Sequence, residues 1–202
     1  MRREFARVEE TCVPSYLHRN PLAAGVAWWR LFAAVQLFGR FGSPGPVLDF
    51  GAATGELGQL LGPGIAYEFV EGDEIMAQAL VSMAPAAVRR RLETLLPGHY
   101  GAVFALDSLE HNENVPDLVD ALIGGLRPDG LLIVSGPTEN SLYRAGRRLA
   151  GFHGHYHHTN IHDIEQVIAA RLANRARRMI PTGLPLFSIT AWGRRAGGPA
   201  AP

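Results

Sequence analysis

Residues 47–58 read VLDFGAATGELG, and the rest of the chain can be placed around this stretch. An apolar run of strand character ends in Asp49, a loop of small residues follows, and a helix-like segment begins near Glu56. Glycine and alanine suit a ligand-holding loop, because a ligand can lie against backbone only where no bulky side chain intervenes. The helix behind the loop offers unpaired N–H groups at its N-terminus. The stretch therefore predicts a nucleotide-binding turn.

The spacing of the small residues separates two kinds of nucleotide site. A dinucleotide fingerprint has glycine at its first, third and sixth positions, but counting from Gly51 the later two positions hold Ala53 and Glu56. Asp49 before Gly51, with Ala53 and Gly55 after it, instead resembles the first motif of class I S-adenosylmethionine (SAM)-dependent methyltransferases. The resemblance implies that SAM lies on this loop. Ala53 departs from the family motif, which has glycine there, and narrows the space beside the cofactor.

Acidic residues after the next two predicted strands extend the resemblance. Residues 65–70 (IAYEFV) alternate as a strand that ends at Glu71. A carboxylate about 20 residues past the loop can accept hydrogen bonds from both ribose hydroxyls, and methyltransferases place an acidic residue there. A weaker strand is predicted within residues 87–92. The resemblance implies that Glu93, which follows it, meets the adenine amino group.

A second block of sequence matches the same family. Residues 100–106 (YGAVFAL) predict a strong strand, and the polar cluster DSLEH follows at 107–111. A helix over 115–126, a turn at 126–130 and a strand at 131–134 come next. With this block the chain resembles small-molecule methyltransferases of type 11 and type 23.

The order of these blocks assigns residues to a site. In an open parallel sheet, ligands lie beyond the ends of the strands. The resemblance therefore implies that Asp107 lines the cofactor pocket and that Glu110 and His111 lie on its substrate side. The cofactor-binding residues that it implies are Asp49, Gly51, Ala52, Ala53, Gly55, Glu71, Glu93, Leu106 and Asp107.

The C-terminal part predicts how the sheet ends. Residues 177–180 and 186–192 are predicted strands separated by the turn PTGLP, so we expect an antiparallel hairpin. Methyltransferase sheets end in such a hairpin. The predicted fold is an α/β, Rossmann-like, seven-stranded methyltransferase sheet in the order 3-2-1-4-5-7-6, with strand 7 antiparallel and helices on both faces. We expect an N-terminal helical cap (1–46), a SAM-dependent methyltransferase domain (47–193) and a disordered tail (194–202).

The predicted cap contains one long apolar helix. Residues 22–41 are apolar over most of the helix circumference, and Asn20 and Pro21 supply a cap and a first-turn proline. We expect this helix to be mostly buried, packed on the domain or over the ligand cleft. Its charged and amide side chains argue against stable membrane insertion, whereas weak interfacial contact stays open.

Charge and cysteine content narrow the partners and the compartment. The 202 residues include 19 basic and 19 acidic residues and one cysteine, Cys12. Zero net charge gives no global attraction to nucleic acid, and a single cysteine cannot form an internal disulfide. With no secretory leader visible, we expect a cytoplasmic protein that binds a small molecule. The oligomeric state is not predicted.

Histidines provide the candidates for a general base. A cluster follows the predicted fifth strand, at His153, His155, His157, His158 and His162. It is open to three interpretations: a metal site, a base with substrate contacts, or polar loop residues. Zinc sites usually draw on cysteines or on a spaced histidine pair on one helix, and neither is present, so no residue is assigned to a metal. For the base, His111 and His157 are favoured, although Glu110 beside His111 also leaves a divalent metal open.

Together these features predict a methyltransferase that uses SAM to methylate an oxygen or nitrogen of a small molecule and leaves S-adenosylhomocysteine (SAH). The Asn or Asp followed by Pro-Pro-Tyr that marks amide or DNA-base methylation is absent, because Ser108 follows Asp107. Two alternatives stay open. The fold can serve as a non-methylating cyclase or binding module, or the protein can modify lipids or glycans at a membrane surface.

Overall fold

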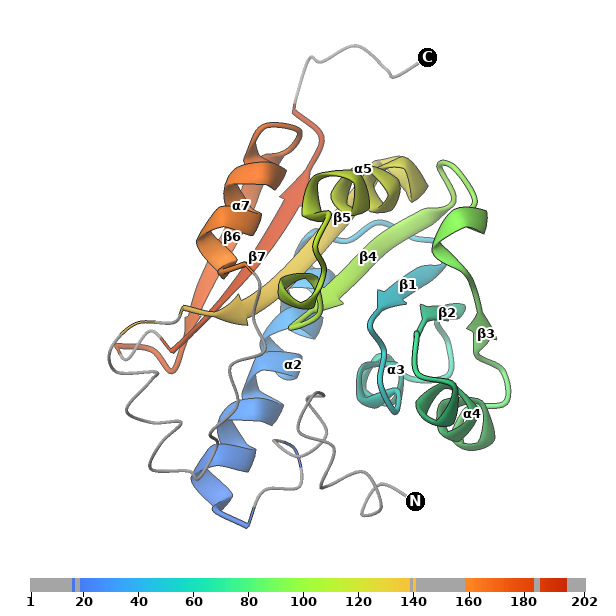
Figure 1. The fold of residues 1–202 in the computed structure, drawn as a ribbon, viewed down its shortest axis with the longest axis horizontal. Coiled ribbons are helices and arrows are strands. Elements are labelled where there is room, and N and C mark those ends of the chain that lie inside the picture. The colour runs from blue at the N-terminus through green and yellow to red at the C-terminus, as the bar shows by residue number, and fades with distance from the viewer. Residues whose placement is uncertain (1–15, 17–18, 139, 141–158, 184–185, 196–202) are drawn as a thin grey trace.

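One seven-stranded sheet forms the centre of the computed structural model, which describes residues 16, 19–138, 140, 159–183 and 186–195. The strand order is β3-β2-β1-β4-β5-β7-β6 (Figure 1), and β7 runs antiparallel to both of its neighbours. The predicted fold class is therefore confirmed. The strands are β1 (Val47–Phe50), β2 (Tyr67–Val70), β3 (Val88–Arg89), β4 (Tyr100–Leu106), β5 (Leu126–Pro137), β6 (Ala173–Ile180) and β7 (Phe187–Gly193).

Helices cover both faces of the sheet, as predicted. The clusters of buried apolar side chains place α5 and α7 on one face and α2, α3 and α4 on the other. Two short 3₁₀ turns, η2 and η3, follow β3 and β4. The helical elements are α2 (Pro21–Phe41), α3 (Glu56–Leu61), α4 (Glu74–Met83), η2 (Leu92–Thr94), η3 (Leu109–His111), α5 (Val115–Gly125) and α7 (Ile161–Ala169).

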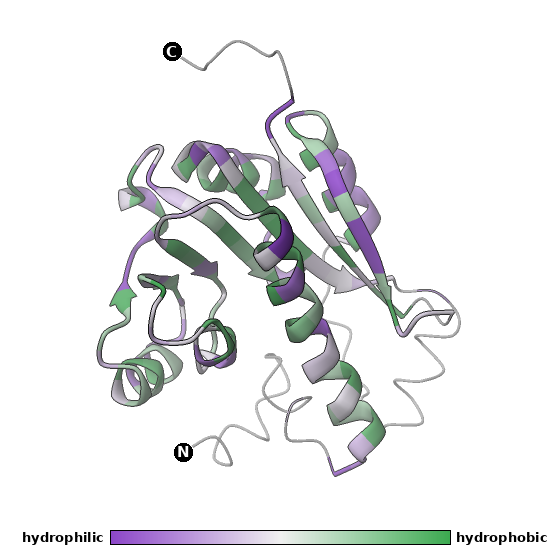
Figure 2. Cartoon of the chain, turned by 180° about the vertical axis from the view of Figure 1, so that it is seen from behind, coloured by the Kyte–Doolittle hydropathy of each residue, from purple (hydrophilic) through white to green (hydrophobic). Residues whose placement is uncertain are grey.

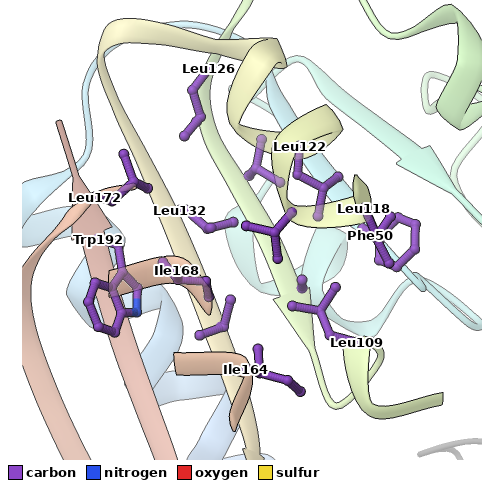
Figure 3. Packing of buried hydrophobic residues seen from close by; sticks show 14 of the residues in the cluster. Phe50, Leu109, Leu118, Leu122, Leu126, Leu132, Ile164, Ile168, Leu172 and Trp192 are labelled. Carbon is purple, nitrogen blue, oxygen red and sulfur yellow. The ribbon is translucent and has the colours of Figure 1, made fainter. Parts of the chain in front are cut away.

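The largest core cluster lies under α5 and α7. Leu118 and Leu122 of α5 and Ile164 and Ile168 of α7 pack beside Leu132 of β5 (Figure 3). Ile164 and Ile168 recur at helical spacing and are both buried, which fixes the face that α7 presents to the sheet. The N-terminus of α7 is capped, because the Asn160 side chain accepts hydrogen bonds from the backbone of His162 and Asp163.

Helix α2 packs across the opposite face of the sheet (Figure 2). Ala33, Ala34 and Leu37 join the core there, so the prediction that this helix packs on the domain is confirmed. The expectation that it is mostly buried is wrong, since Leu22, Trp29 and Phe32 are 78%, 45% and 49% exposed. By length and composition alone α2 could also cross a membrane, although core helices of soluble proteins share these features.

Several predicted boundaries shift in the structure. β2 begins at Tyr67 rather than at residue 65, and β3 has only two residues. Residues 126–130, predicted as a turn, belong to β5 because Leu126 pairs with Tyr100 before the register shifts at Ala102. An irregular strand can continue through Pro and Gly where neighbouring pairs hold it.

Candidate functional site

A pocket of about 360 Å³ lies beyond the carboxyl ends of β1, β2 and β4. In the sheet order β1 and β4 are neighbours where the chain changes direction, which is where open α/β sheets bind ligands. The pocket brings together most of the predicted residues. Those that line it are Asp49, Gly51, Ala52, Ala53, Glu71, Leu106, Asp107 and His111.

The backbone of the loop after β1 depends on its small residues. Gly51 has a φ of +75°, and a Cβ there would lie 2.5 Å from the Cβ of Ser108. The loop thus passes so close to the end of β4 that a side chain at position 51 would collide with it. Ala53 adopts a φ of +46°, a left-handed conformation that strains a residue other than glycine. This strain is the cost of having alanine where the family motif has glycine.

Glu71 holds the same loop from the end of β2. Its Oε2 accepts a hydrogen bond from the Ala53 backbone N–H at 2.7 Å, and its Oε1 accepts one from Asp73 at 2.9 Å. Each carboxylate oxygen has a second lone pair, so these contacts leave capacity for other donors. The assignment of Glu71 to the ribose hydroxyls stays a prediction. The structure adds a role in ordering the loop.

Asp49 is buried at the end of β1 and 4% exposed. The Tyr67 hydroxyl donates a hydrogen bond to its Oδ2 at 2.5 Å. Burial raises the pKa of Asp49 from 3.8 to about 7; the hydrogen bond from Tyr67 lowers it, whereas the charges of Glu71 and Glu56 raise it. The wall of the pocket therefore gathers three acidic side chains, of which Asp49 and Glu56 are buried and Glu71 is half-buried.

These features fit SAM. Its sulfonium and amino groups are cationic, and Asp49, Glu56 and Glu71 all line the pocket. The hydroxyl of Ser108, which also lines it, is buried and has no hydrogen-bond partner within the described residues. A buried polar atom of this kind is normally satisfied by a bound group. The residues present would thus hold SAM through acidic side chains and exposed loop backbone.

Asp107 differs from the other acids because it is paired. It forms a buried ion pair with Arg30 of α2, and the Ser135 hydroxyl donates to its Oδ1 at 3.2 Å. The guanidinium of Arg30 lies 4.2 Å from the centre of the Phe187 ring. Arg30 therefore ties helix α2 to the end of β4 through Asp107 and to the start of β7 through Phe187.

Other predicted residues fall elsewhere. Glu93 is exposed in η2 and does not line the pocket, whereas its neighbour Leu92 does, because the short β3 turns the backbone at that point. Gly55 instead begins α3 beside Leu80, with a φ of +80°. Glu110 is buried and does not line the pocket, so it does not share that surface with His111. His157 lies outside the described residues.

Sequence reasoning missed several residues of the wall. Glu56 was interpreted as the start of a helix, and Ser108 and Asn112 were passed over within the polar cluster after β4. A loop followed by an acidic first-turn residue was the available signal for Glu56. Tyr16 and Leu31 line the pocket from the N-terminal segment, and no local motif marks them.

Metal ligands do not assemble in the described residues. Within these ranges no group of three or more His, Cys, Asp or Glu side chains is placed to hold an ion. His162 is 53% exposed at the start of α7, 3.9 Å from Glu165. The other four histidines of the cluster lie outside the described residues, so their role stays open.

Comparison with known proteins gives the family. A family model described as a methyltransferase domain matches residues 28–175, more than half of the chain. The chain belongs to this family and is a SAM-dependent methyltransferase, as the resemblance implied. No curated protein matches it.

Solved structures show the same fold at low identity. The N-methyltransferase NodS from Bradyrhizobium japonicum WM9, in complex with SAH, is 12% identical with a TM-score of 0.71, over 96% of this chain and 99% of that chain. Magnesium protoporphyrin IX methyltransferase (ChlM) from Synechocystis PCC 6803, with bound SAH, is 19% identical with a TM-score of 0.61, over 87% and 88%. The PH0226 protein from Pyrococcus horikoshii OT3 is 16% identical with a TM-score of 0.65, over 80% and 87%.

Proposed function

We propose that this methyltransferase transfers the methyl group of SAM to an oxygen or nitrogen of a small-molecule acceptor. The observation that carries the proposal is the composition of the pocket wall. Tyr16 and Leu31 of the N-terminal segment line the same pocket as Gly51 and His111. An acceptor must reach the cofactor loop through a pocket of about 360 Å³ whose wall includes these two side chains. A pocket of this size suits a small molecule.

The residues of the chain have separate tasks in this reaction. SAM, when bound, supplies a methyl group that is already activated on a sulfonium. The acidic side chains of Asp49, Glu56 and Glu71 hold the cationic cofactor in one orientation, which aligns the acceptor for transfer. Leu31 and Leu106 add apolar wall that excludes water.

His111 is the base in this proposal. It sits at the end of η3, immediately after β4, and lines the pocket. An imidazole accepts a proton near neutral pH, and an oxygen or nitrogen acceptor must lose one during methylation. Two of the similar structures support an acceptor of this kind by name, because NodS is an N-methyltransferase and ChlM acts on magnesium protoporphyrin IX.

The acceptor can be found by incubating the protein with labelled SAM and a metabolite extract. A low-molecular-mass product that carries the label supports the proposal, and label appearing only in nucleic acid or protein contradicts it. A folded protein that binds SAM but labels nothing would favour a binding module. With the acceptor known, His111→Ala should lower turnover about 10²- to 10⁴-fold with SAM affinity nearly unchanged.

The matched control is His99→Ala. His99 precedes β4 at the amino end of the strand, away from the pocket and 3.4 Å from Glu68, so its loss should not affect turnover. Equal losses in the two variants would contradict the assignment of the base. Activity that is lost with EDTA and restored by magnesium or zinc would show that a metal ion, rather than a histidine base, activates the acceptor.

A membrane-surface acceptor is the second candidate. Leu22, Trp29 and Phe32 recur at intervals of seven and three residues on the exposed side of α2, and they would serve as interfacial anchors. Flotation with anionic vesicles tests this, because Trp29→Ser with Phe32→Ser should abolish any binding that depends on this face. Cytoplasmic location stays a prediction.

A further inference from the structure

Tyr67 is a buried residue at the start of β2 that the fold brings to Asp49. It pairs in register with Val47, and its side chain reaches along the same face of the sheet to Asp49 on the neighbouring strand. The ring is 9% exposed and stacks on Phe69 with their centres 6.5 Å apart. A Cβ at Gly58 of α3 would lie 2.9 Å from the ring, so the helix presses directly on it. Packing therefore fixes the hydroxyl in place.

The groups that act on the charge of Asp49 are mostly acidic and favour its protonated form. Glu71 at the end of β2 and Glu56 on α3 both raise the pKa of Asp49, and burial raises it further. The basic residue that reaches this end of the sheet from α2 is Arg30, which is paired with Asp107 of β4. Tyr67 is the group that favours the ionised form, by donating to Oδ2.

We propose that Tyr67 is a positioning residue that holds Asp49 by Oδ2 and favours its ionised form. A cationic group of SAM requires this carboxylate, so the affinity for SAM depends on whether Asp49 carries a proton. The structure gives Oδ1 of Asp49 no hydrogen bond within the described residues, and this oxygen is the one left for the cofactor. The inference concerns the cofactor shared by the family and is independent of the proposed acceptor.

The linkage has a definite sign. The pKa of Asp49 is about 7 without a ligand. At lower pH the side chain is mostly protonated, and binding a cation must release that proton. SAM affinity should therefore rise by up to about tenfold per pH unit between pH 5.5 and 7 and level off above pH 7.

Calorimetric titration with SAM between pH 5.5 and 8.5 measures this, and repeating it in buffers of different ionisation enthalpy counts the protons released. Asp49→Asn should lower affinity and lose the rise. Tyr67→Phe should move the rise about one pH unit upward, so that affinity falls about 3- to 10-fold at pH 7 and recovers at pH 8.5. If Tyr67→Phe lowers affinity by the same factor at every pH, the role is structural and the proposal is wrong.

Two control variants test whether the pH dependence of SAM binding comes from Asp49 and Tyr67. Tyr100 is also buried and donates to a β2 carboxylate, Glu68, at 2.9 Å, away from the pocket; Tyr100→Phe should leave the pH profile of SAM binding unchanged. Histidines as a class titrate in the same range, so His111→Asn must retain the rise if Asp49 causes it. A rise that disappears with His111→Asn overturns the proposal.

A second variant decides the case if Tyr67→Phe does not fold. Gly58→Ala keeps the hydroxyl but pushes on the ring at 2.9 Å, and it should move the rise upward like Tyr67→Phe. An unchanged profile for Gly58→Ala, or identical profiles for wild type and Asp49→Asn, would overturn the linkage.

Discussion

The two sides of the pocket are built in different ways. The cofactor side comes from one continuous segment and the strand beside it: the end of β1, the first turn of α3 and the end of β2 supply Asp49, Glu56 and Glu71. The other side is assembled from distant parts of the chain, since Arg30 of α2 pairs with Asp107 after β4 and stacks on Phe187 of β7. On one side neighbouring acids raise the pKa of Asp49, whereas on the other Arg30 balances the charge of Asp107.

This difference distinguishes residues that serve cofactor binding from residues that stabilise the fold. Carboxylates gathered on a buried surface weaken the protein without its cofactor and strengthen it when a cation binds. A buried ion pair instead contributes to holding the fold together and costs a great deal when only one partner is removed.

Breaking the ion pair should have the largest effect on stability. Arg30→Met keeps an apolar stem but leaves the Asp107 carboxylate buried beside the Ser135 hydroxyl without its cation, so the free energy of unfolding should fall by about 3–5 kcal/mol. Adding Asp107→Asn should recover part of the loss. Denaturant unfolding measures both. As a control, Arg171→Met breaks the exposed pair with Asp120 and should cost less than about 1 kcal/mol; similar losses at the two sites would contradict the comparison.

Adding a methyl group to the loop should remove cofactor binding. Gly51→Ala places a Cβ 2.5 Å from Ser108 at a φ of +75°, so we expect SAM affinity to fall more than about 100-fold and stability to fall by about 2–4 kcal/mol. Gly62→Ala is the matched control, because Gly62 has a φ of +82° with nothing within 4 Å of the added Cβ. It should cost about 1–2 kcal/mol and leave SAM binding intact. Calorimetry measures SAM binding and thermal melts measure stability, so together they separate backbone strain from the collision with Ser108. Normal SAM binding by Gly51→Ala would contradict this prediction.

Removing the charge of Asp49 should stabilise the protein in the absence of its cofactor. The pKa of Asp49 is raised from 3.8 to about 7, so as the pH rises from about 4 to 7 the unfolded chain releases this proton while the folded protein keeps it. Stability therefore falls over this range. Asp49→Asn should abolish that fall and be more stable by about 1–3 kcal/mol at pH 8, with little difference near pH 4. Urea unfolding at the two pH values tests this, and a variant that is less stable at pH 8 would refute it.

Relieving backbone strain should have the smallest effect. Ala53→Gly removes the penalty of a φ of +46° but adds flexibility to the unfolded chain, so the net gain in stability should be about 0–1 kcal/mol. Thermal melts compare it with the wild type. A loss of more than about 1 kcal/mol would mean that the methyl group of Ala53 packs favourably in the loop.

Local pattern was enough for most of the fold. Residues 100–106 predicted β4 with the bounds that the structure has, and the glycine loop predicted the turn after β1. The turn predicted at 126–130 failed, because pairing between Leu126 and Tyr100 extends β5 through Pro128 and Gly130. Pairing with a distant strand overrides local turn preference, and a single sequence does not display that pairing.

The sequence by itself determined the sheet order and the identity of the cofactor through its resemblance to a methyltransferase family, because the motifs that carry the resemblance are formed by neighbouring residues along one strand and one loop. Glu71 could be found in this way, since a strand end is visible in the alternation that precedes it. Tertiary structure alone decided that Glu93 stays outside the pocket, that Tyr67 reaches Asp49 and that Arg30 neutralises Asp107. Each depends on how far a side chain reaches between elements that are distant in sequence, and on burial, which changes the free energy of a charge without any change in the residue that carries it.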